Sequence, residues 1–337
     1  MNAKLTFAAL AVASVTLVGC GGSSNDTQVE TSGRFSLGVS DSPASVQNVT
    51  IAFKQVVLKG QNGETYNYEV ASNQGGALQV NLLNYQGGDI APLVNGKELP
   101  FGEYQMCIFM ENREQYDAAS SFVIDANGNG LGLDTNSQGS CAGVTADEPG
   151  TGRLFFNKAF TIAAGDNNFV VEFDLAKVLQ SPHGNKDYYT LKPTGVQLVN
   201  TVEVGSIDGD VTAEFMAQCE ADAGGSVFSP AVYLYPQNTG LDSMSDFRSG
   251  AVELGQQLPL ASARVVQDDS TPTSYDYEFG FVAAGTYTVG YTCLAQNDDP
   301  DADNNADDVD APFKMFAASG NLTVVAGEDT HYNFTGL

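Results

Sequence analysis

The feature that most constrains the fold of this chain is a set of short motifs that occurs twice. In each half, a Gly-x-Tyr turn and strand leads into a cysteine, Cys107 in the first half and Cys293 in the second. Further along each half, a Thr-containing apolar run ends at Ala-Gly followed by an acidic residue. The four segments are 100–104 and 160–166 in the first half, and 283–287 and 322–328 in the second. Matching motifs in matching order predict two related domains.

The repeated glycine and tyrosine resemble the tyrosine corner of Greek-key sandwiches, in which a buried tyrosine donates its hydroxyl to the backbone. The alternative is that β-sandwiches in general reuse turn glycines and strand tyrosines. Alternating polar and apolar residues over 34–40 and a β-rich run over 49–58 predict strands, and Asn62-Gly63 predicts a hairpin turn with positive φ at both residues. Asn81 and Asp174 are placed to cap short helices.

These patterns predict an all-β protein with two Greek-key β-sandwich (prealbumin-like) domains in tandem and one or two short helices. We expect the first domain to span residues 33–204 and the second to span 205–337. At about 130 residues, the second domain is long enough to bury a core of its own.

The amino terminus predicts export and lipidation. A basic leader and a short apolar run precede Leu17-Val18-Gly19-Cys20, which is typical of a signal peptide over residues 1–19. The last four residues resemble the bacterial lipobox, which implies cleavage before Cys20 and lipidation of that cysteine. The alternative is an ordinary signal peptide with a chance cysteine. Residues 20–32 are small and polar and predict a flexible tether, and Gly21-Gly22 after the cysteine favours an outer-membrane lipoprotein of the bacterial envelope.

The charge of the chain excludes one class of partner. Without Lys4, which belongs to the leader, the mature side chains carry 13 − 41 = −28 charges, and no basic block occurs anywhere. Nucleic acid is therefore excluded as a partner, because its phosphates would be repelled. Anionic lipid would be repelled as well, which leaves the N-terminal lipid as the only membrane contact.

The cysteine count predicts two disulfides. Five cysteines become four once Cys20 carries lipid, and an even number in an exported protein is typical of disulfide pairing. Cys107–Cys141 with Cys219–Cys293 is the only pairing that keeps each bridge within one predicted domain. Free buried thiols are the alternative.

Two families resemble parts of the chain. The bacterial domain-of-unknown-function (DUF) 4382 lipoproteins resemble residues 33–204, on the runs GRFSLGVSDSP, VTIAFKQVVL, VNLLNYQGG, LPFGEYQMCIF and YYTLKPTGVQLV. Carboxypeptidase-regulatory-like or transthyretin-like β-sandwiches resemble the C-terminal part, on IDGDVTAEF, AVYLYP, YEFGFVAAGTYTVGY and LTVVAGEDTHYNF. Neither family brings an established activity, so no functional residue follows from either resemblance.

Catalytic signatures are missing from the sequence. The two histidines, His183 and His331, lack the spacing of a zinc site, and no Gly-x-Ser-x-Gly elbow is present. A Ser-His-Asp triad stays open, because its members meet only in space. We therefore predict that the protein is not an enzyme.

The acidic segment 298–310 is the one metal-site candidate. Oxygen side chains fall at the spacing of a calcium loop, at Asp299, Asp301, Asp303, Asn305, Asp307 and Asp310. However, Asn304 stands where such loops need glycine, and no flanking helices are evident. The spacing therefore favours a solvated acidic loop, with bound Ca²⁺ as the alternative and as the only candidate cofactor.

Taken together, these features predict an envelope lipoprotein that acts as a non-catalytic binding or structural module, with a protein or a polysaccharide as its partner. A calcium-dependent adhesin is one alternative. An envelope hydrolase whose site is not visible in the sequence is another.

Overall fold

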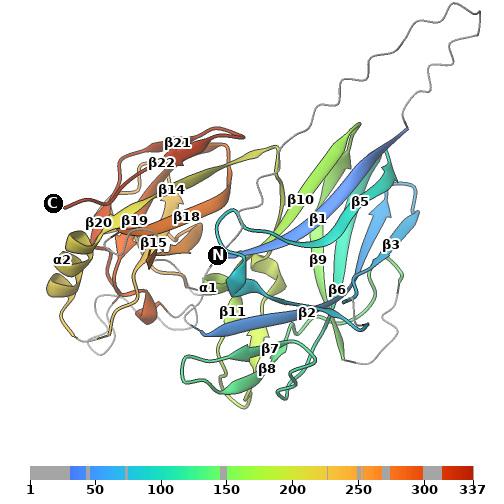
Figure 1. The fold of residues 1–337 in the computed structure, drawn as a ribbon, viewed down its shortest axis with the longest axis horizontal. Coiled ribbons are helices and arrows are strands. Elements are labelled where there is room, and N and C mark those ends of the chain that lie inside the picture. The colour runs from blue at the N-terminus through green and yellow to red at the C-terminus, as the bar shows by residue number, and fades with distance from the viewer. Residues whose placement is uncertain are drawn as a thin grey trace, which may run out of the picture. The chain divides into compact units, whose positions relative to one another are not determined.

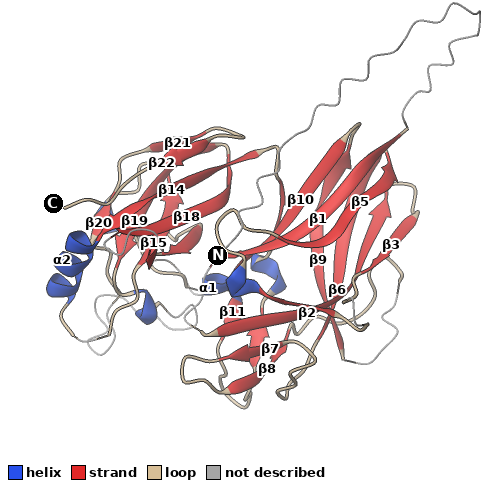
Figure 2. Cartoon of the chain, in the orientation of Figure 1, coloured by secondary structure: helices blue, strands red, loops and turns tan. Residues whose placement is uncertain are grey.

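In the described residues the regular secondary structure is mostly β-strand, arranged as two sandwiches in tandem with two short α-helices (Figures 1 and 2). This computed structural model describes residues 31–42, 46–72, 75–144, 150–225, 227–248, 252, 254–267, 274–298 and 313–336. The predicted fold class is confirmed. Residues 31–337 form one compact unit, although the two sandwiches have separate hydrophobic cores.

The first sandwich pairs a four-stranded sheet, in the order β13-β10-β1-β5, with a nine-stranded sheet, in the order β11-β12-β8-β7-β2-β6-β9, in which β3 and β4 also pair with β2. Its elements are β1 (Ser32–Ser42), β2 (Asn48–Gly60), β3 (Thr65–Glu69), β4 (Leu78–Asn81), η1 (Leu82–Asn84), β5 (Ala91–Pro100), β6 (Gly102–Glu111), β7 (Phe122–Ile124), β8 (Gly130–Asp134), β9 (Thr151–Ile162), β10 (Asp166–Asp174), α1 (Leu175–Val178), β11 (Leu179–Gln180), β12 (Tyr189–Leu191), η2 (Pro193–Gly195) and β13 (Gln197–Asn200).

The second sandwich pairs a sheet in the order β17-β18-β14-β22 with a sheet in the order β16-β15-β19-β20, in which β21 also pairs with β19. Its elements are β14 (Val204–Thr212), α2 (Ala213–Ala223), β15 (Ala231–Pro236), η3 (Leu241–Ser243), β16 (Ala261–Arg264), β17 (Val266–Gln267), β18 (Ser274–Ala283), β19 (Gly285–Thr292), η4 (Ala295–Asn297), β20 (Ala317–Ala318), β21 (Leu322–Val324) and β22 (Asp329–His331).

Alternation of residue types explains how β1 joins the core. Phe35, Leu37 and Val39 all point inward and are at most 1% exposed. The ring of Phe35 lies 5.9 Å from that of Phe160 and 6.0 Å from that of Phe169, measured between centroids. Strands β1 and β10 are parallel neighbours, so these rings join sheet pairing to core packing.

The predicted turns and caps are only partly correct. Asn81 caps η1, accepting a 3.3 Å hydrogen bond from the amide of Leu83. At the β2–β3 hairpin only Gly63 has positive φ, at 88°, because the Gly60–Glu64 hydrogen bond closes a three-residue loop instead of the predicted two-residue one. Asp174 precedes α1 but makes no capping hydrogen bond.

Helix α2 is absent from the sequence-based prediction. Thr212 caps it through a 3.3 Å hydrogen bond from the amide of Phe215, and it ends at Gly224, whose φ is 69°. A threonine before Ala-Glu and a Gly-Gly pair twelve residues after that threonine are the ordinary start and stop signals of a helix. The strand patterns before and after this segment led the sequence-based prediction to miss the helix.

The repeated motifs occupy equivalent places in the two sandwiches. Tyr104 in β6 donates its hydroxyl to the carbonyl oxygen of Pro100 at 2.8 Å, and Tyr287 in β19 donates to Ala283 at 2.9 Å. Strand β1 pairs in parallel with β10, as β14 does with β22. The hydroxyl-to-backbone bond predicted for the tyrosine corner is therefore present in both halves. The independence of the two domains stays a prediction.

Both predicted disulfides are present. Cys107 is bonded to Cys141 and Cys219 to Cys293, with Cα–Cα distances of 5.6 and 6.1 Å. The second bridge lies in the core of its sandwich and ties α2 to the end of β19. The first lies outside the main core, in a small cluster with Val57 and Phe109.

Candidate functional site

A pocket of about 800 Å³ opens in the first sandwich and is a candidate for a binding site. Its volume is within the range of ligand sites in general. Strand β9 is at one end of the nine-stranded sheet and β11 and β12 are the last two strands at the other end, yet all three contribute to the wall of the pocket. The lining residues are Thr135, Asn136, Ser137, Phe155, Phe156, Asn157, Lys158, Gln180, Thr190, Leu191, Lys192, Pro193, Thr194, Val196, Gln197 and Leu198.

An irregularity in β9 shapes one wall. Tyr104 pairs with Phe160 but Met106 pairs with Phe156, so three residues of β9, 157–159, lie opposite the single residue Gln105. Bulges of this kind change the direction in which side chains point. Here Lys158 is exposed and lines the pocket, as does Phe155, which is 37% exposed.

Another part of the wall is the short turn η2. Pro193 occupies its first turn, where the missing amide hydrogen costs nothing. Gly195 lies against α1 so closely that a Cβ atom there would overlap Cγ1 of Val178. The amide of Lys192 donates to the carbonyl oxygen of Val178 at 2.8 Å. Helix α1 therefore holds this wall in place.

Cationic side chains gather round the pocket. Lys158 and Lys192 line it, and Lys186 donates to lining atoms of Asn136 and Thr190, each at 3.3 Å. Arg153 donates from Nε to the hydroxyl of Ser137 at 3.3 Å. None of the described lining residues is acidic, whereas the whole chain has 41 acidic residues and 14 basic ones. The pocket is thus locally positive on a strongly negative protein.

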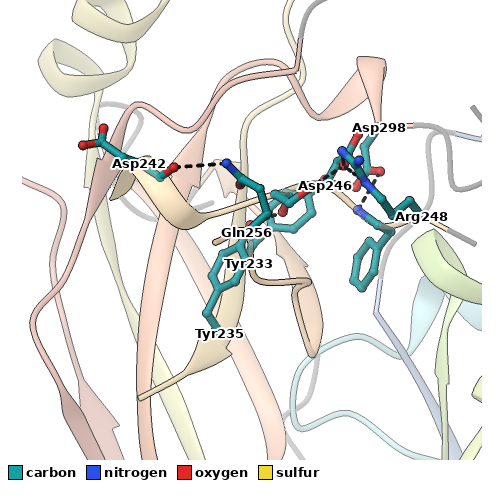
Figure 3. A network of polar contacts seen from close by, with 9 residues as sticks. Tyr233, Tyr235, Asp242, Asp246, Arg248, Gln256 and Asp298 are labelled. Atoms are coloured by element: carbon teal, nitrogen blue, oxygen red, sulfur yellow. Dashed lines mark hydrogen bonds and ion pairs between the residues drawn. The ribbon is translucent and has the colours of Figure 1, made fainter. Parts of the chain in front are cut away.

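A second group of polar residues lies where the predicted calcium loop begins (Figure 3). Asp298 accepts from the hydroxyl of Tyr233 at 2.8 Å and from the amide of Phe247 at 3.1 Å. Beside it, Arg248 donates to Asp246 from Nη2 at 2.7 Å, and both side chains are almost fully buried. Burial, followed by the charge of Asp246, raises the pKa of Asp298 well above its usual value. The two hydrogen bonds that Asp298 accepts act in the opposite direction.

The predicted metal and lipid residues fall outside the described residues. These are Cys20 and the six oxygen-bearing residues Asp299, Asp301, Asp303, Asn305, Asp307 and Asp310. In the part of the chain that the structure describes, no three His, Cys, Asp or Glu side chains are placed to hold a metal ion. The two histidines lie apart. His183 is in an exposed loop, and His331 on β22 has its Nδ1 3.4 Å from Oδ2 of Asp208 on β14.

Sequence reasoning did not predict the pocket. Part of its wall is nevertheless the run Lys192-Pro193-Thr194, within one of the segments that carried the family resemblance. The sequence signal that could have pointed to this part of the wall is a lysine directly before a Pro-x-Gly turn. Among the described residues, no helix has both the length and the apolar character of a membrane span.

Solved structures that resemble this chain do so only weakly. A leucine-rich repeat protein from Bacteroides thetaiotaomicron is 13% identical with a TM-score of 0.20, over 90% of this chain and 26% of that one. The TIE protein of Bacillus anthracis is 11% identical with a TM-score of 0.16, over 90% and 33%. A fimbrial anchor protein from Porphyromonas gingivalis is 9% identical with a TM-score of 0.17, over 78% and 83%.

This chain therefore spans about a quarter and a third of the first two proteins. The TM-scores are too low to support an inference about function. No curated protein matches the chain significantly. One family does match, over residues 32–193, and its description is "Domain of unknown function (DUF4382)". The first of the two resemblances seen in the sequence is therefore confirmed for this segment.

Proposed function

We propose that the protein is a lipid-anchored, non-catalytic binding module of the bacterial envelope, and that the pocket of its first sandwich binds an acidic oligosaccharide. The observation that carries this proposal is the pocket's lining, which combines lysines with hydroxyl and amide side chains and contains no carboxylate. The anchor rests on the sequence around Cys20.

The chemistry of the lining fits such a ligand. Threonine and serine hydroxyls and the amides of Asn136, Asn157 and Gln197 can both donate to and accept from sugar hydroxyls. The exposed ring of Phe155 offers an apolar surface for the C–H face of a sugar ring. Lys158 and Lys192 would attract the ligand's carboxylate or sulfate groups. A protein partner would need a broader surface than a pocket of this size.

The same lining supports binding over hydrolysis. Hydrolysis of a glycosidic bond normally needs a pair of carboxyl groups flanking that bond. The described lining residues include no Asp, Glu, His or Cys. The calcium-dependent adhesin would depend on residues 299–310, which lie outside the described residues, and no further observation favours it.

The pocket can be tested by calorimetric titration with oligogalacturonate, which is acidic, and with dextran fragments, which are neutral. We expect the acidic probe alone to bind, with an affinity that falls as salt is added. Lys158→Gln should weaken binding about tenfold, which corresponds to the loss of one charged contact of about 1.4 kcal/mol. Lys97→Gln, at an exposed lysine on β5 of the other sheet, is the matched control. Equal loss in both variants, or equal binding of both probes, would contradict the proposal.

The anchor requires a separate test. Replacing Cys20 with serine should release the protein from membranes, because no other membrane contact is predicted. A variant that still sediments with membranes after a high-salt wash would remove the lipid from the proposal and leave the pocket untouched.

A further inference from the structure

Two carboxylates lie buried where the first sandwich contacts the second. Asp41 is near the end of β1, which contacts β16, and Asp174 ends β10 and precedes α1. Within α1, Ala176 packs against the cluster of the second sandwich that contains Tyr233, Phe247 and Phe313. We call this contact region, with Asp41, Asp174 and Ala176 on one side and Arg264 and Gly280 on the other, the joint.

The joint is closely packed at its backbone. Gly280 of β18 lies so near Gly87 that a Cβ atom on Gly280 would overlap the carbonyl oxygen of Gly87. The side chain of Glu278 reaches Gly87 and Gly88 from the same strand. Asp41 and Asp174 are themselves buried, so their polar atoms depend on partners within the protein.

Neither buried carboxylate has such a partner. Asp41 is 3% exposed and Asp174 is 4% exposed, and none of their four oxygens accepts a hydrogen bond of normal geometry from a described residue. The backbone amides of Leu175, beside Asp41, and of Lys177, beside Asp174, favour the charged forms and offset part of the effect of burial. Asp298 differs, since it accepts two hydrogen bonds. A buried ionised carboxylate without a partner is strongly unfavourable, and it becomes neutral by taking up a proton.

The charges around the two carboxylates do not compensate for their burial. Burial has the largest effect on Asp41 and raises its pKa well above the usual value. The charge of Asp174 raises this pKa further, and so does that of Glu172 on β10. The positive charge of Arg264 on β16 lowers it. Burial raises the pKa of Asp174 to about 7, against the attraction of Lys177. Burial and Asp174 raise the pKa of Glu172, which is partly exposed, to about 8. Asp298 and Tyr233 of the second sandwich also face Asp174.

We propose that protons hold the joint closed: Asp41 and Asp174 are neutral while the two sandwiches are packed together, and ionisation of the pair loosens the contact. In the unfolded chain both groups ionise near pH 4. The folded protein therefore binds more protons than the unfolded chain between about pH 4 and pH 7. The contribution of the neutral pair to stability is fully present below that range and is lost as the pH rises through it.

The test compares the full chain with the Asp41→Asn/Asp174→Asn variant at pH 5.5 and pH 8.5, by calorimetric melting and by small-angle X-ray scattering. The wild type should melt at least about 3 °C lower at pH 8.5, which in a chain of this size corresponds to a change of one or two kcal/mol. Its radius of gyration should increase as well. The double variant should keep the same radius of gyration at both pH values. Its melting temperature should fall much less between pH 5.5 and pH 8.5 than that of the wild type. Asp187→Asn, at an exposed aspartate remote from the joint, should behave as the wild type.

Three results would overturn the proposal. The first is a wild-type radius and melting temperature that do not change with pH. The second is a double variant that retains the full wild-type decrease in melting temperature, which would assign the effect to the general negative charge of the protein. The third is an effect of added calcium at pH 8.5 that restores the melting temperature of the wild type but not that of the double variant. A cation, and not protons, would then neutralise the pair.

Discussion

The two sandwiches share one framework and use it differently. Each has the same tyrosine hydrogen bond to the backbone four residues earlier, and each has a first strand that pairs in parallel with a late one. Each also has one disulfide. Cys219–Cys293 lies inside the second core, whereas Cys107–Cys141 lies outside the first core and braces the segment after β8.

That braced segment contributes to the pocket. Arg153 on β9 donates to the hydroxyl of Ser137 and, at 2.6 Å, to the carbonyl oxygen of Ser140, next to Cys141. Ser137 lines the pocket. One disulfide therefore lies within the core of its sandwich, whereas the other braces a segment that lines the pocket. A repeated framework does not imply repeated function.

Removing each disulfide should give the largest difference between the sandwiches. On the chain-entropy relation, the bridge with a sequence separation of 74 contributes about 4.5 kcal/mol and the one with 34 about 4 kcal/mol. Cys219→Ala/Cys293→Ala also leaves a gap in a packed core, so its total loss in urea unfolding should exceed that of Cys107→Ala/Cys141→Ala. The latter pair should weaken oligogalacturonate binding, and the former should not. Reversed effects on binding would contradict the comparison.

Equivalent glycines should show where the frameworks coincide. A Cβ atom at Gly33 would overlap the carbonyl oxygen of Ala163, and one at Gly205 would overlap that of Val325, at the matching place of the repeat. Gly33→Ala and Gly205→Ala should each lower the free energy of unfolding by about 1–3 kcal/mol. Gly240→Ala, with open space around its Cα, is the control. A loss in only one of the two variants would mean that the sandwiches differ at this point.

The tyrosine hydroxyls should give the smallest effect. Tyr104→Phe removes a part-buried hydrogen bond from a side chain that is 2% exposed, and should cost about 1 kcal/mol in chemical unfolding. Tyr287→Phe removes the equivalent bond at an exposed position and should cost less. Tyr116→Phe, at a tyrosine that is 49% exposed, is the control. A larger loss for Tyr287→Phe would reverse the expected order.

The sequence predicted what depends on local patterns. Alternation gave the strand over residues 34–40, spacing gave the tyrosine corners, and domain assignment gave the disulfide pairs. The pocket was not predictable, because it is lined by strands from the two ends of a nine-stranded sheet and depends on an irregularity in β9 that only strand pairing reveals. The joint was hidden for a similar reason. Asp41 and Asp174 have the sequence character of turn and cap residues, yet both are buried in the folded chain.

The four-residue helix α1 has a consequence for both proposed sites. Ala176 contacts the second sandwich, while Val178, half a turn away, packs against Gly195, whose neighbours Thr194 and Val196 line the pocket. One rigid element therefore belongs to the pocket and to the joint. Energetic coupling between two sites is reciprocal by thermodynamic necessity. If the pocket binds its ligand more tightly when the joint is closed, saturating the pocket must draw protons from solution near neutral pH. Titrations in buffers of different ionisation enthalpy would detect this uptake as a change in the measured heat.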